Sequence, residues 1–477
     1  MTIASIVFIF FFLPISLGIY YLVSDDKKEF VLLAISLLFY ACGSLGTFII
    51  FTISVCINVL IGRGILRTKR HKPLSLLLLI GGIVFDVGLL AYYKYSNFAL
   101  INFGKLLGQD IITRNLIIPL GISFFTFKEI SYLVDIYTGK AVAAENPVRD
   151  ALYISFFAQV QSGPISRYNQ MQLAAPQEGS LSRFRSDLFA DGVMKFMIGF
   201  NKKILLADIL YNITKETFSL TAGSMSVGYA WLGAICFSLQ LYYDFSGYSD
   251  MAIGITQMFG YTCDRNFDYP YITQSVSEFW RRWHISLGSW FRDYIYIPMG
   301  GSRVKTKWRL ALNLLVVWAL TGIWHGASWN FVFWGLTYFV MIAFEKFTGY
   351  PQKIRSKFGK VIYRIFVLLF INFEWVIFNS SGLNAGLRYI KNMFFCPSNP
   401  LADTRMLFML KDNFAFILCA VIFCIPVIPY IEKKLANSRY GKRVWQAAFA
   451  GVTIFLFIWA VSFALAGHNN PFAYANF

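Results

Sequence analysis

The chain has 477 residues, of which 57% are hydrophobic and only 14% are charged. Soluble domains carry about 25% charged residues, so this composition excludes an ordinary soluble protein. The formal net charge is +18, but the basic residues gather in short loops between apolar segments. Such loops favour the cytoplasmic side of a membrane, and they exclude the basic folded domain that nucleic-acid binding requires. The basic loops cover residues 63–72, 281–309, 346–364 and 433–443.

Apolar segments recur along the whole chain. A bilayer core about 30 Å thick needs roughly 20 apolar residues per helix, and a few of the segments are long enough for two helices. The sequence therefore predicts an all-α, polytopic membrane protein with roughly 10–13 membrane helices plus interfacial helices. The N-terminal segment lacks a basic start and a small-residue cleavage site, so we expect a retained first span. The apolar segments are 3–23, 30–62, 74–93, 112–134, 188–212, 227–260, 308–344, 359–378, 413–431 and 443–467.

Polar stretches are too short for a soluble domain, so we expect one membrane-embedded domain over residues 1–477. The longest of them, about 166–187 and 396–412, are predicted to be loops. The seven cysteines mostly lie in apolar runs without a CxxC pair, which indicates small core residues rather than disulfides or metal ligands. With the last two basic loops on the inside, the tail 467–477 is expected on the outside.

Two carboxylates, Asp244 and Asp250, lie inside the apolar segment 227–260. Polar groups within a membrane cost free energy, which makes them functional candidates. At this spacing the two side chains would point to different faces of a straight helix, and Gly247 is expected to allow a break between them. Two interpretations are open: the carboxylates fix helix packing through hydrogen bonds, or they serve the function directly.

An aromatic and basic segment follows at 278–294. Its apolar residues recur at helical spacing and predict one stripe on one helix, whereas Arg281, Arg282 and Arg292 lie off that stripe. One interpretation is an amphipathic interfacial helix with its arginines on lipid head groups. The other gives the arginines a phosphate-bearing donor to hold, because Arg suits bidentate phosphate contacts. The stripe comprises Trp280, Trp283, His284, Leu287, Phe291 and Tyr294.

The strongest single candidate is His325. Only four histidines occur in the chain, and this one lies between apolar segments. The ordinary pKa of histidine, about 6.5, allows the neutral side chain to accept a proton, as a general base must. Gly322 and Gly326 would allow a close approach of backbone around it. The alternative, for His325 and equally for His284, is a buried histidine that only packs.

Four motifs occur in a fixed order. They are Asp244-Phe-Ser-Gly-Tyr-Ser-Asp-Met-Ala-Ile-Gly254, Asn266-Phe-Asp-Tyr-Pro-Tyr271, Ser277-Glu-Phe-Trp-Arg-Arg-Trp-His284 and Trp324-His-Gly326. Together these motifs resemble the membrane-bound O-acyltransferase (MBOAT) family. The resemblance is to its bacterial branch, which includes the alginate O-acetylation membrane protein, the peptidoglycan O-acetyltransferase and the teichoic-acid D-alanylation membrane protein. The matching motifs concentrate in residues 240–335, and none of them is specific alone.

The resemblance implies a multi-helix fold in which funnels from both membrane faces meet at a narrow tunnel. It implies that His325 is the catalytic residue and that His284 is a second family position with a less settled role. The family takes an acyl group from a cytoplasmic donor and delivers it to a hydroxyl outside. The structural polar residues of the tunnel would be Asp244, Asp250, Trp324 and Asn330.

The C-terminal sequence Pro471-Phe-Ala-Tyr-Ala-Asn-Phe477 is similar to the Phe-x-Tyr-x-x-Phe tail of many bacterial members. The resemblance implies that Tyr474 is an acyl carrier. A phenol, whose pKa is about 10, loses its proton more easily than a sugar hydroxyl, and its ester is more activated. The alternative is that Phe472 and Tyr474 only anchor the tail at the membrane interface. Alanines at 473 and 475, where bulkier residues are common, weaken the match.

These expectations combine into one mechanism in the bacterial cytoplasmic membrane. An acetyl thioester, either acetyl-CoA or an acyl carrier, binds near Arg281, Arg282 and Arg292, and His325 acts as general base without a bound cofactor or metal. The acyl group passes to an extracytoplasmic partner transferase of the SGNH type, which modifies a cell-envelope polysaccharide such as alginate or peptidoglycan.

Three other functions stay open at this point. The first is D-alanyl transfer to teichoic acid. The second is a transporter that moves an acyl donor without covalent chemistry, which intramembrane carboxylates at 244 and 250 would suit. The third is a lipid- or protein-acylating enzyme, against which the 277–284 motif argues.

Overall fold

The computed structural model describes residues 1–141, 146–168, 184–220, 224–394, 400–435, 439–467 and 469–472. Within these ranges every regular element is a helix and no strand is present. Six of the helical segments described are long and apolar enough to cross a membrane, and a shorter apolar one spans Phe8–Leu22. The all-α, polytopic prediction is confirmed, while the higher number of spans stays a prediction. The six segments are Leu45–Arg67, Lys72–Leu107, Trp329–Thr348, Lys357–Asn379, Thr404–Phe423 and Tyr440–Leu465.

The chain forms two compact units. The first contains Met1–Phe196 and Ser249–Arg265, and the second contains Met197–Tyr248 and Asn266–Phe477. One long helix, α11 (Val227–Met258), contributes residues to both units. The expectation of one functional domain stays a prediction.

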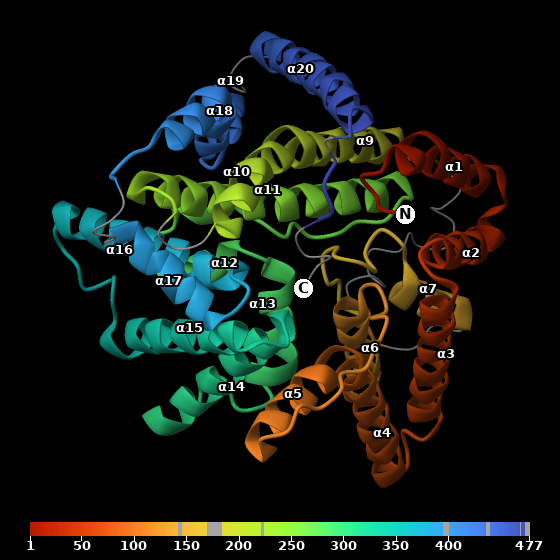
Figure 1. Cartoon of the computed structure of the whole chain (residues 1–477). Helices are drawn as coiled ribbons and strands as arrows, with labels where there is room; N and C mark the ends of the chain where they lie inside the picture. Colours follow the sequence, from red (N-terminus) through yellow and green to blue (C-terminus); the bar gives the residue numbers. More distant parts are fainter. Residues whose placement is uncertain are drawn as a thin grey trace. The chain divides into compact units, whose positions relative to one another are not determined.

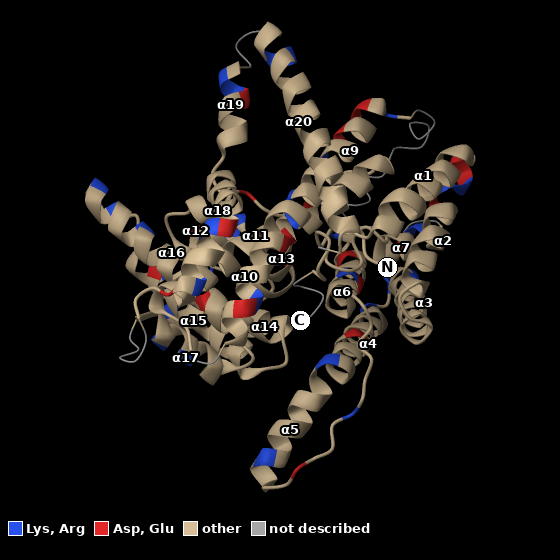
Figure 2. Ribbon diagram, turned by 45° about the horizontal axis from the view of Figure 1, so that its top comes forward, with Lys and Arg blue, Asp and Glu red and all other residues tan. Residues whose placement is uncertain are grey.

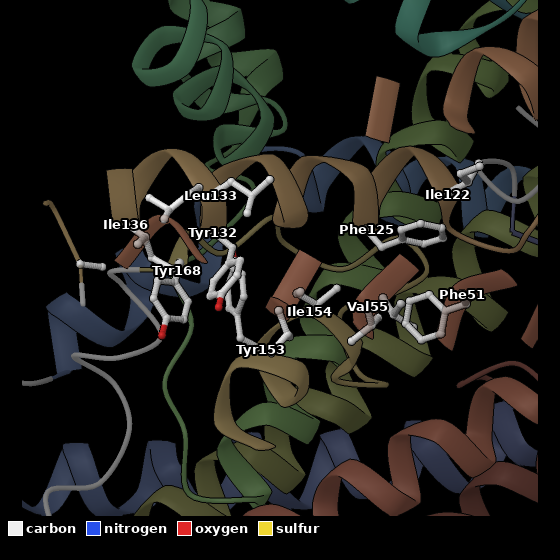
Figure 3. Close-up of a cluster of buried hydrophobic side chains, with 14 of the residues drawn as sticks. Phe51, Val55, Ile122, Phe125, Tyr132, Leu133, Ile136, Tyr153, Ile154 and Tyr168 are labelled. Atoms are coloured by element: carbon white, nitrogen blue, oxygen red, sulfur yellow. The ribbon is translucent and has the colours of Figure 1, made fainter. Parts of the chain in front are cut away.

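In the first unit, α3, α4 and α6 pack against one another (Figure 1). Figure 3 shows part of this core, where Phe51 and Val55 of α3 lie beside Phe125 of α6, and Tyr132 of α6 lies beside Tyr153 and Tyr168. Almost every residue of α6 is buried, so this helix forms the centre of the unit rather than its surface. The helices are α1 (Leu13–Leu22), α2 (Lys28–Ala41), α3 (Leu45–Arg67), α4 (Lys72–Leu90), α5 (Ser96–Leu107), α6 (Ile122–Thr138), α7 (Pro147–Ser155) and the start of α9 (Ser186–Asn201).

The second unit holds most of the motifs found in the sequence. Several of its helices begin at a side chain that accepts a hydrogen bond from the first turn: Ser275, Thr306, Ser356 and Asp403. Lys and Arg lie at the N-terminal end of α16, and two lysines lie in the last turn of α19 (Figure 2). The elements are the π-helical turn η4 (Lys202–Ala207), α10 (Asp208–Ser219), α12 (Val276–Arg282), α13 (Ile285–Phe291), α14 (Lys307–His325), α15 (Trp329–Thr348), α16 (Lys357–Asn379), α17 (Leu383–Phe394), α18 (Thr404–Phe423), α19 (Val427–Leu435) and α20 (Arg439–Leu465).

The apolar segment 227–260 is not interrupted at Gly247, so that prediction is wrong. Helix α11 runs through this position without a break. A Cβ atom at Gly247 would lie 2.7 Å from the carbonyl oxygen of Gly199. The glycine therefore serves the close approach of two backbones rather than a break in the helix.

The segment 278–294 is not a single helix, which corrects a second prediction. Helix α12 ends at Arg282 and α13 begins at Ile285. Between them, His284 adopts a left-handed backbone conformation with φ of +44°. Apart from Trp280, which is partly buried, the residues of the aromatic stripe are buried on both sides of this turn. Their helical spacing therefore reflects burial rather than one continuous helix.

The two polar stretches contain more helix than expected. Helix α18 starts at Thr404, where Asp403 caps it, so the loop predicted at 396–412 ends early. Helix α9 starts at Ser186, and residues 169–183 of the other predicted loop lie outside the described residues. The prediction of helix pairs is confirmed for 30–62, which forms α2 and α3, and for 308–344.

The described cysteines are free thiols, as expected from their spacing. Cys236 and Cys424 are buried, as predicted for small core residues. Cys42, Cys56 and Cys419 are instead exposed at the protein surface, so the core prediction is wrong for these three. Cys396 lies outside the described residues.

A candidate active site in the second unit

His325 is the last residue of α14 and is only 3% exposed. Its imidazole ring lies among aromatic rings, with ring centroids 4.9 Å from Trp324, 5.0 Å from Trp334 and 5.2 Å from Phe378. The three neighbours come from α14, α15 and α16. His325 is therefore buried inside the second unit, and its catalytic role stays a prediction.

Glycines set the distance between α14 and α15, which lie side by side in Figure 1. A Cβ atom at Gly322 would lie 2.5 Å from the carbonyl oxygen of Phe331, and one at Gly335 would lie 2.5 Å from that of Trp318. A Cβ atom at Gly326 would meet the ring of Phe331. The expected close backbone approach around the histidine is therefore present, and it brings α15 against the end of α14.

His284 is held in place by an asparagine of the second motif. Its Nδ1 atom lies 3.2 Å from Oδ1 of Asn266, which also accepts hydrogen bonds from the backbone N–H and the hydroxyl of Ser286. Because that oxygen can only accept, Nδ1 of His284 carries the proton and Nε2 carries the lone pair. Asn266 thus fixes both the ring orientation and the tautomer.

The electrostatic environment keeps His284 neutral. The residue is only 1% exposed and lies outside the long apolar helices. Burial lowers the pKa of His284 from its ordinary value to about 3, because a charged imidazolium would lose its hydration. A group with so low a pKa is a weak proton acceptor near neutral pH, which suits a hydrogen-bonding role better than that of a general base.

The two histidines belong to one aromatic cluster. The ring of His284 lies 4.6 Å from Phe245 of α11 and 6.2 Å from Trp324. Trp324 in turn contacts His325. All four motifs singled out in the sequence therefore meet around the two imidazoles.

A wall of aromatic rings that the sequence analysis did not assign to the site borders His325. Trp334 and Tyr338 of α15 contact Trp280 of α12, with ring centroids 5.5 and 5.0 Å from it. Glu345 holds α12 against α15 by accepting hydrogen bonds from two backbone N–H groups at the start of α12. The sequence offered one signal for this wall: Trp334 and Tyr338 are four residues apart, which places them on the same face of a helix that follows the Trp-His-Gly motif.

Asp244 forms a buried ion cluster. Nζ of Lys203 lies 2.7 Å from a carboxylate oxygen of Asp244 and 2.7 Å from one of Asp208. All three side chains are 3% exposed or less. The packing interpretation of Asp244 is supported by these contacts. Lys203 and Asp208 were missed, although charges inside the apolar segment 188–212 were the same signal that identified Asp244.

The described part of the C-terminal tail, Asn469–Phe472, lies on this cluster. The backbone N–H of Asn470 donates to Asp208 at 3.3 Å. The ring of Phe472 lies 4.6 Å from Nζ of Lys203 and 4.8 Å from the ring of Tyr248. Tyr474 lies outside the described residues, but the chain that leads to it is attached to α11 one turn from Phe245.

The other predicted tunnel residues have structural partners. Asp250 belongs to the first unit and pairs with Lys195 at 3.5 Å. Asn330 is buried and donates hydrogen bonds to the carbonyl oxygens of Ile377 and Ser380, which ties α15 to the end of α16. A tunnel role for either residue stays a prediction.

Two of the three predicted donor-binding arginines already have carboxylate partners. Arg282 lies 3.3 Å from Asp268 and 2.9 Å from Glu278. Arg292 pairs with Asp293 at 2.8 Å, while Arg281 is exposed. Contact of these arginines with a donor phosphate stays a prediction.

The chain is similar to known bacterial proteins whose names all describe O-acetylation. The chain is 36% identical to a probable alginate O-acetylase AlgI of Azotobacter vinelandii over 433 residues, covering 88% of this chain and 84% of the relative. It is 36% identical to the Pseudomonas aeruginosa AlgI, with 83% and 75% covered, and 32% identical to the peptidoglycan O-acetyltransferase of Helicobacter pylori, with 81% and 78% covered.

More distant relatives include a teichoic acid D-alanyltransferase of Bacillus subtilis, 29% identical over 283 residues, with 56% of this chain and 70% of the relative covered. The model of the membrane-bound O-acyltransferase family matches residues 146–385, which include all four motifs and both histidines. The resemblance inferred from the motifs is confirmed, and the chain belongs to the membrane-bound O-acyltransferase (MBOAT) family.

Proposed function

We propose that this protein transfers an acetyl group from a cytoplasmic thioester to a hydroxyl group, for O-acetylation of a cell-envelope polysaccharide. The observation that carries the proposal is the buried aromatic cluster that joins His325 to His284 through Trp324. The similarity to alginate and peptidoglycan O-acetylases supports acetyl as the acyl group and a polysaccharide as the final acceptor. The bacterial relatives favour the cytoplasmic membrane as the location.

In the proposed reaction, His325 accepts the proton of the attacking hydroxyl while the oxygen bonds to the thioester carbonyl carbon. The carbon–sulfur bond then breaks, and the proton passes from the imidazolium to the thiolate that leaves. The products are an ester and a free thiol, so no other reactant is needed. His284, kept neutral by burial, offers its Nε2 lone pair as a hydrogen-bond acceptor that orients the hydroxyl.

The donor would be acetyl-CoA or an acetylated carrier, with exposed Arg281 as a contact for its phosphate group. Arg282 and Arg292 would have to share their guanidinium groups with the carboxylates that they already contact. The proposal includes no bound cofactor and no metal ion.

The first acceptor in this scheme is the phenol of Tyr474, which passes the acetyl group to an extracytoplasmic SGNH-type transferase. The attachment of Phe472 to Lys203 and Tyr248 supports the scheme, because it places the start of the tail on the helix that also contacts His284.

A test in cells compares the His325→Ala variant with His71→Ala, an exposed histidine in a loop. At equal protein levels, His325→Ala should abolish O-acetylation of the envelope polysaccharide, while His71→Ala should retain it. Normal acetylation in the His325→Ala strain would refute the proposal.

The D-alanyl alternative rests on the more distant similarity to teichoic acid D-alanyltransferases. Supplying the purified protein with labelled acetyl and labelled D-alanyl thioesters in parallel separates the two. Acetyl transfer at the higher rate supports the proposal, and D-alanyl transfer at the higher rate would replace it.

A further inference from the structure

Three indole N–H groups near His325 are buried without a hydrogen bond among the described residues, and the one that belongs to Trp375 interacts with the hydroxyl group of Tyr271. The other two have no such interaction within this part of the chain. They belong to Trp280 of α12 and Trp334 of α15. The two rings lie edge to face, with centroids 5.5 Å apart and an interplanar angle of 85°. Trp334 is fully buried and its ring centroid lies 5.0 Å from that of His325.

The chemistry of these groups restricts what can satisfy them. An indole N–H can donate a hydrogen bond but cannot accept one, so its partner must carry a lone pair. A buried donor without a partner costs free energy, which is why such groups in folded proteins deserve a specific explanation. A cation or another donor could not satisfy either indole.

Tyr338 packs against both rings but has a candidate partner of its own. Its hydroxyl and one carboxylate oxygen of Glu374 are both buried without a hydrogen bond among the described residues. The phenol and the carboxylate interact electrostatically, which makes Glu374 the candidate acceptor for this hydroxyl. Neither Trp280 nor Trp334 donates a hydrogen bond from its indole N–H among the described residues, which leaves them as the pair to be explained.

The reaction proposed above produces an acceptor of the required kind. When a hydroxyl oxygen attacks a thioester, the carbonyl oxygen becomes negatively charged, and enzymes stabilise it with preorganised donors in a site that excludes water. We propose that Trp334 and Trp280 are further catalytic residues, whose indole N–H groups donate hydrogen bonds to the thioester carbonyl oxygen as it becomes an oxyanion. This inference rests on the proposed function of His325.

The arrangement suits this role because both indoles are fixed before the substrate binds. Trp334 is one turn from Tyr338 on a helix held close to α14 by Gly322 and Gly335. Trp280 is fixed through α12, which Glu345 attaches to α15. Donors held in this way need little reorganisation during the reaction.

The test uses purified full-length protein in liposomes with acetyl-CoA as the probe. Trp334 and, separately, Trp280 are replaced by phenylalanine and by β-(3-benzothienyl)alanine, which keeps the bicyclic shape and lacks the N–H. Each benzothienyl variant should lower kcat about 100-fold with little change in KM, because the lost bond strengthens only in the transition state. Its melting temperature should stay within a degree or two of the parent, because the lost N–H had no partner in the protein.

Trp318 provides the matched control. Its ring lies 5.0 Å from Trp280 and 6.4 Å from Trp334, but its N–H is not one of the buried unpartnered donors. The same replacement there should leave kcat within a few-fold of the parent. Unchanged kcat in the Trp334 variant, or an equal loss in the Trp318 variant, would overturn the inference.

The outcome also separates this inference from the function on which it rests. If His325→Ala is inactive while the benzothienyl variants are fully active, only the oxyanion role fails. If His325→Ala is active, the proposed function itself fails.

Discussion

At the scale of single residues, the two histidines of the site have different environments. His284 is fixed by a polar partner, Asn266, in a strained left-handed conformation. His325 is surrounded by the rings of Trp324, Trp334 and Phe378. The sequence could predict that both histidines matter, because histidine is rare in this chain. It could not predict the tautomer of His284, because that depends on a residue eighteen positions earlier.

The low pKa of His284 predicts how stability depends on pH. The unfolded chain binds a proton at His284 below about pH 6.5, whereas the folded protein resists protonation until about pH 3. Between these pH values the unfolded state therefore binds more protons than the folded state. The contribution of His284 to the free energy of unfolding is complete above about pH 6.5 and declines as the pH falls toward 3.

The melting temperature of the detergent-solubilised protein at pH 7 and pH 5 checks this dependence. His284→Gln, which cannot titrate, should lose less stability on acidification than the parent does. His71→Ala should behave like the parent because that side chain is exposed. Identical pH profiles for the parent and His284→Gln would contradict the assignment.

The buried Lys203 cluster makes a second prediction at this scale. Lys203→Met leaves the carboxylates of Asp208 and Asp244 buried without their cation, which should destabilise the protein by about 3–5 kcal/mol. Adding Asp208→Asn and Asp244→Asn should restore much of that loss, because the uncompensated charges are then gone. Lys215→Met, at an exposed position on the neighbouring helix, is the control.

Thermal unfolding in detergent compares the stability of Lys203→Met, of the triple variant and of the Lys215→Met control. A stability of Lys203→Met equal to that of the control would show that the cluster is not buried from solvent as the contacts indicate.

At the scale of helices, length and hydropathy predicted the pair that forms α14 and α15 but could not predict how closely they pack. That distance depends on Gly322 and Gly335, which face the opposite backbone. In the segment 278–294 the spacing of residues predicted one helix where the chain forms two. Its aromatic residues recur at helical spacing, but the chain turns at His284. Asn266, which lies outside this segment, accepts a hydrogen bond from the backbone N–H of Ser286 just after the turn.

Gly335→Ala should separate α14 from α15. The added methyl group would lie 2.5 Å from the carbonyl oxygen of Trp318, which belongs to backbone and cannot move away cheaply. We expect a loss of about 1–3 kcal/mol in stability, as for other overpacked interiors, together with a loss of acyl transfer, because Trp334 moves relative to His325.

Gly451→Ala is the matched control for this change. No heavy atom lies within 4 Å of a Cβ atom at Gly451, and the residue lies in a helix interior of α20. It should be neutral or slightly stabilising, since alanine is the better helix former. Equal melting temperatures for Gly335→Ala and Gly451→Ala would show that the α14–α15 contact tolerates a side chain.

At the scale of the whole molecule, composition alone predicted a helical membrane protein, and the motifs predicted its family. The histidines, Trp324 and Asp244 could be selected from the sequence because each is unusual in its apolar surroundings. Lys203, Glu345 and the indoles of the site could not be assigned in that way. Their roles depend on which helices meet, and one sequence does not specify these contacts.

The Lys203 cluster connects the described part of the tail to α10 and α11. It lies between α10 and α11 and contacts the tail through Asn470 and Phe472. Asp244, a carboxylate in an apolar segment that would also suit a transporter, is paired with a lysine. This pairing supports a packing role for Asp244.

In the proposed mechanism, His325 catalyses transfer of the acetyl group from the thioester to Tyr474, so that the protein itself becomes acetylated. The most direct measurement is the amount of labelled acetyl bound covalently to the purified protein after exposure to labelled acetyl-CoA, followed by mapping of the modified residue. We expect label on Tyr474 in the parent and in His71→Ala, and none in His325→Ala or Tyr474→Phe. Label that persists in His325→Ala, or transport of intact donor without any labelled protein, would contradict this mechanism.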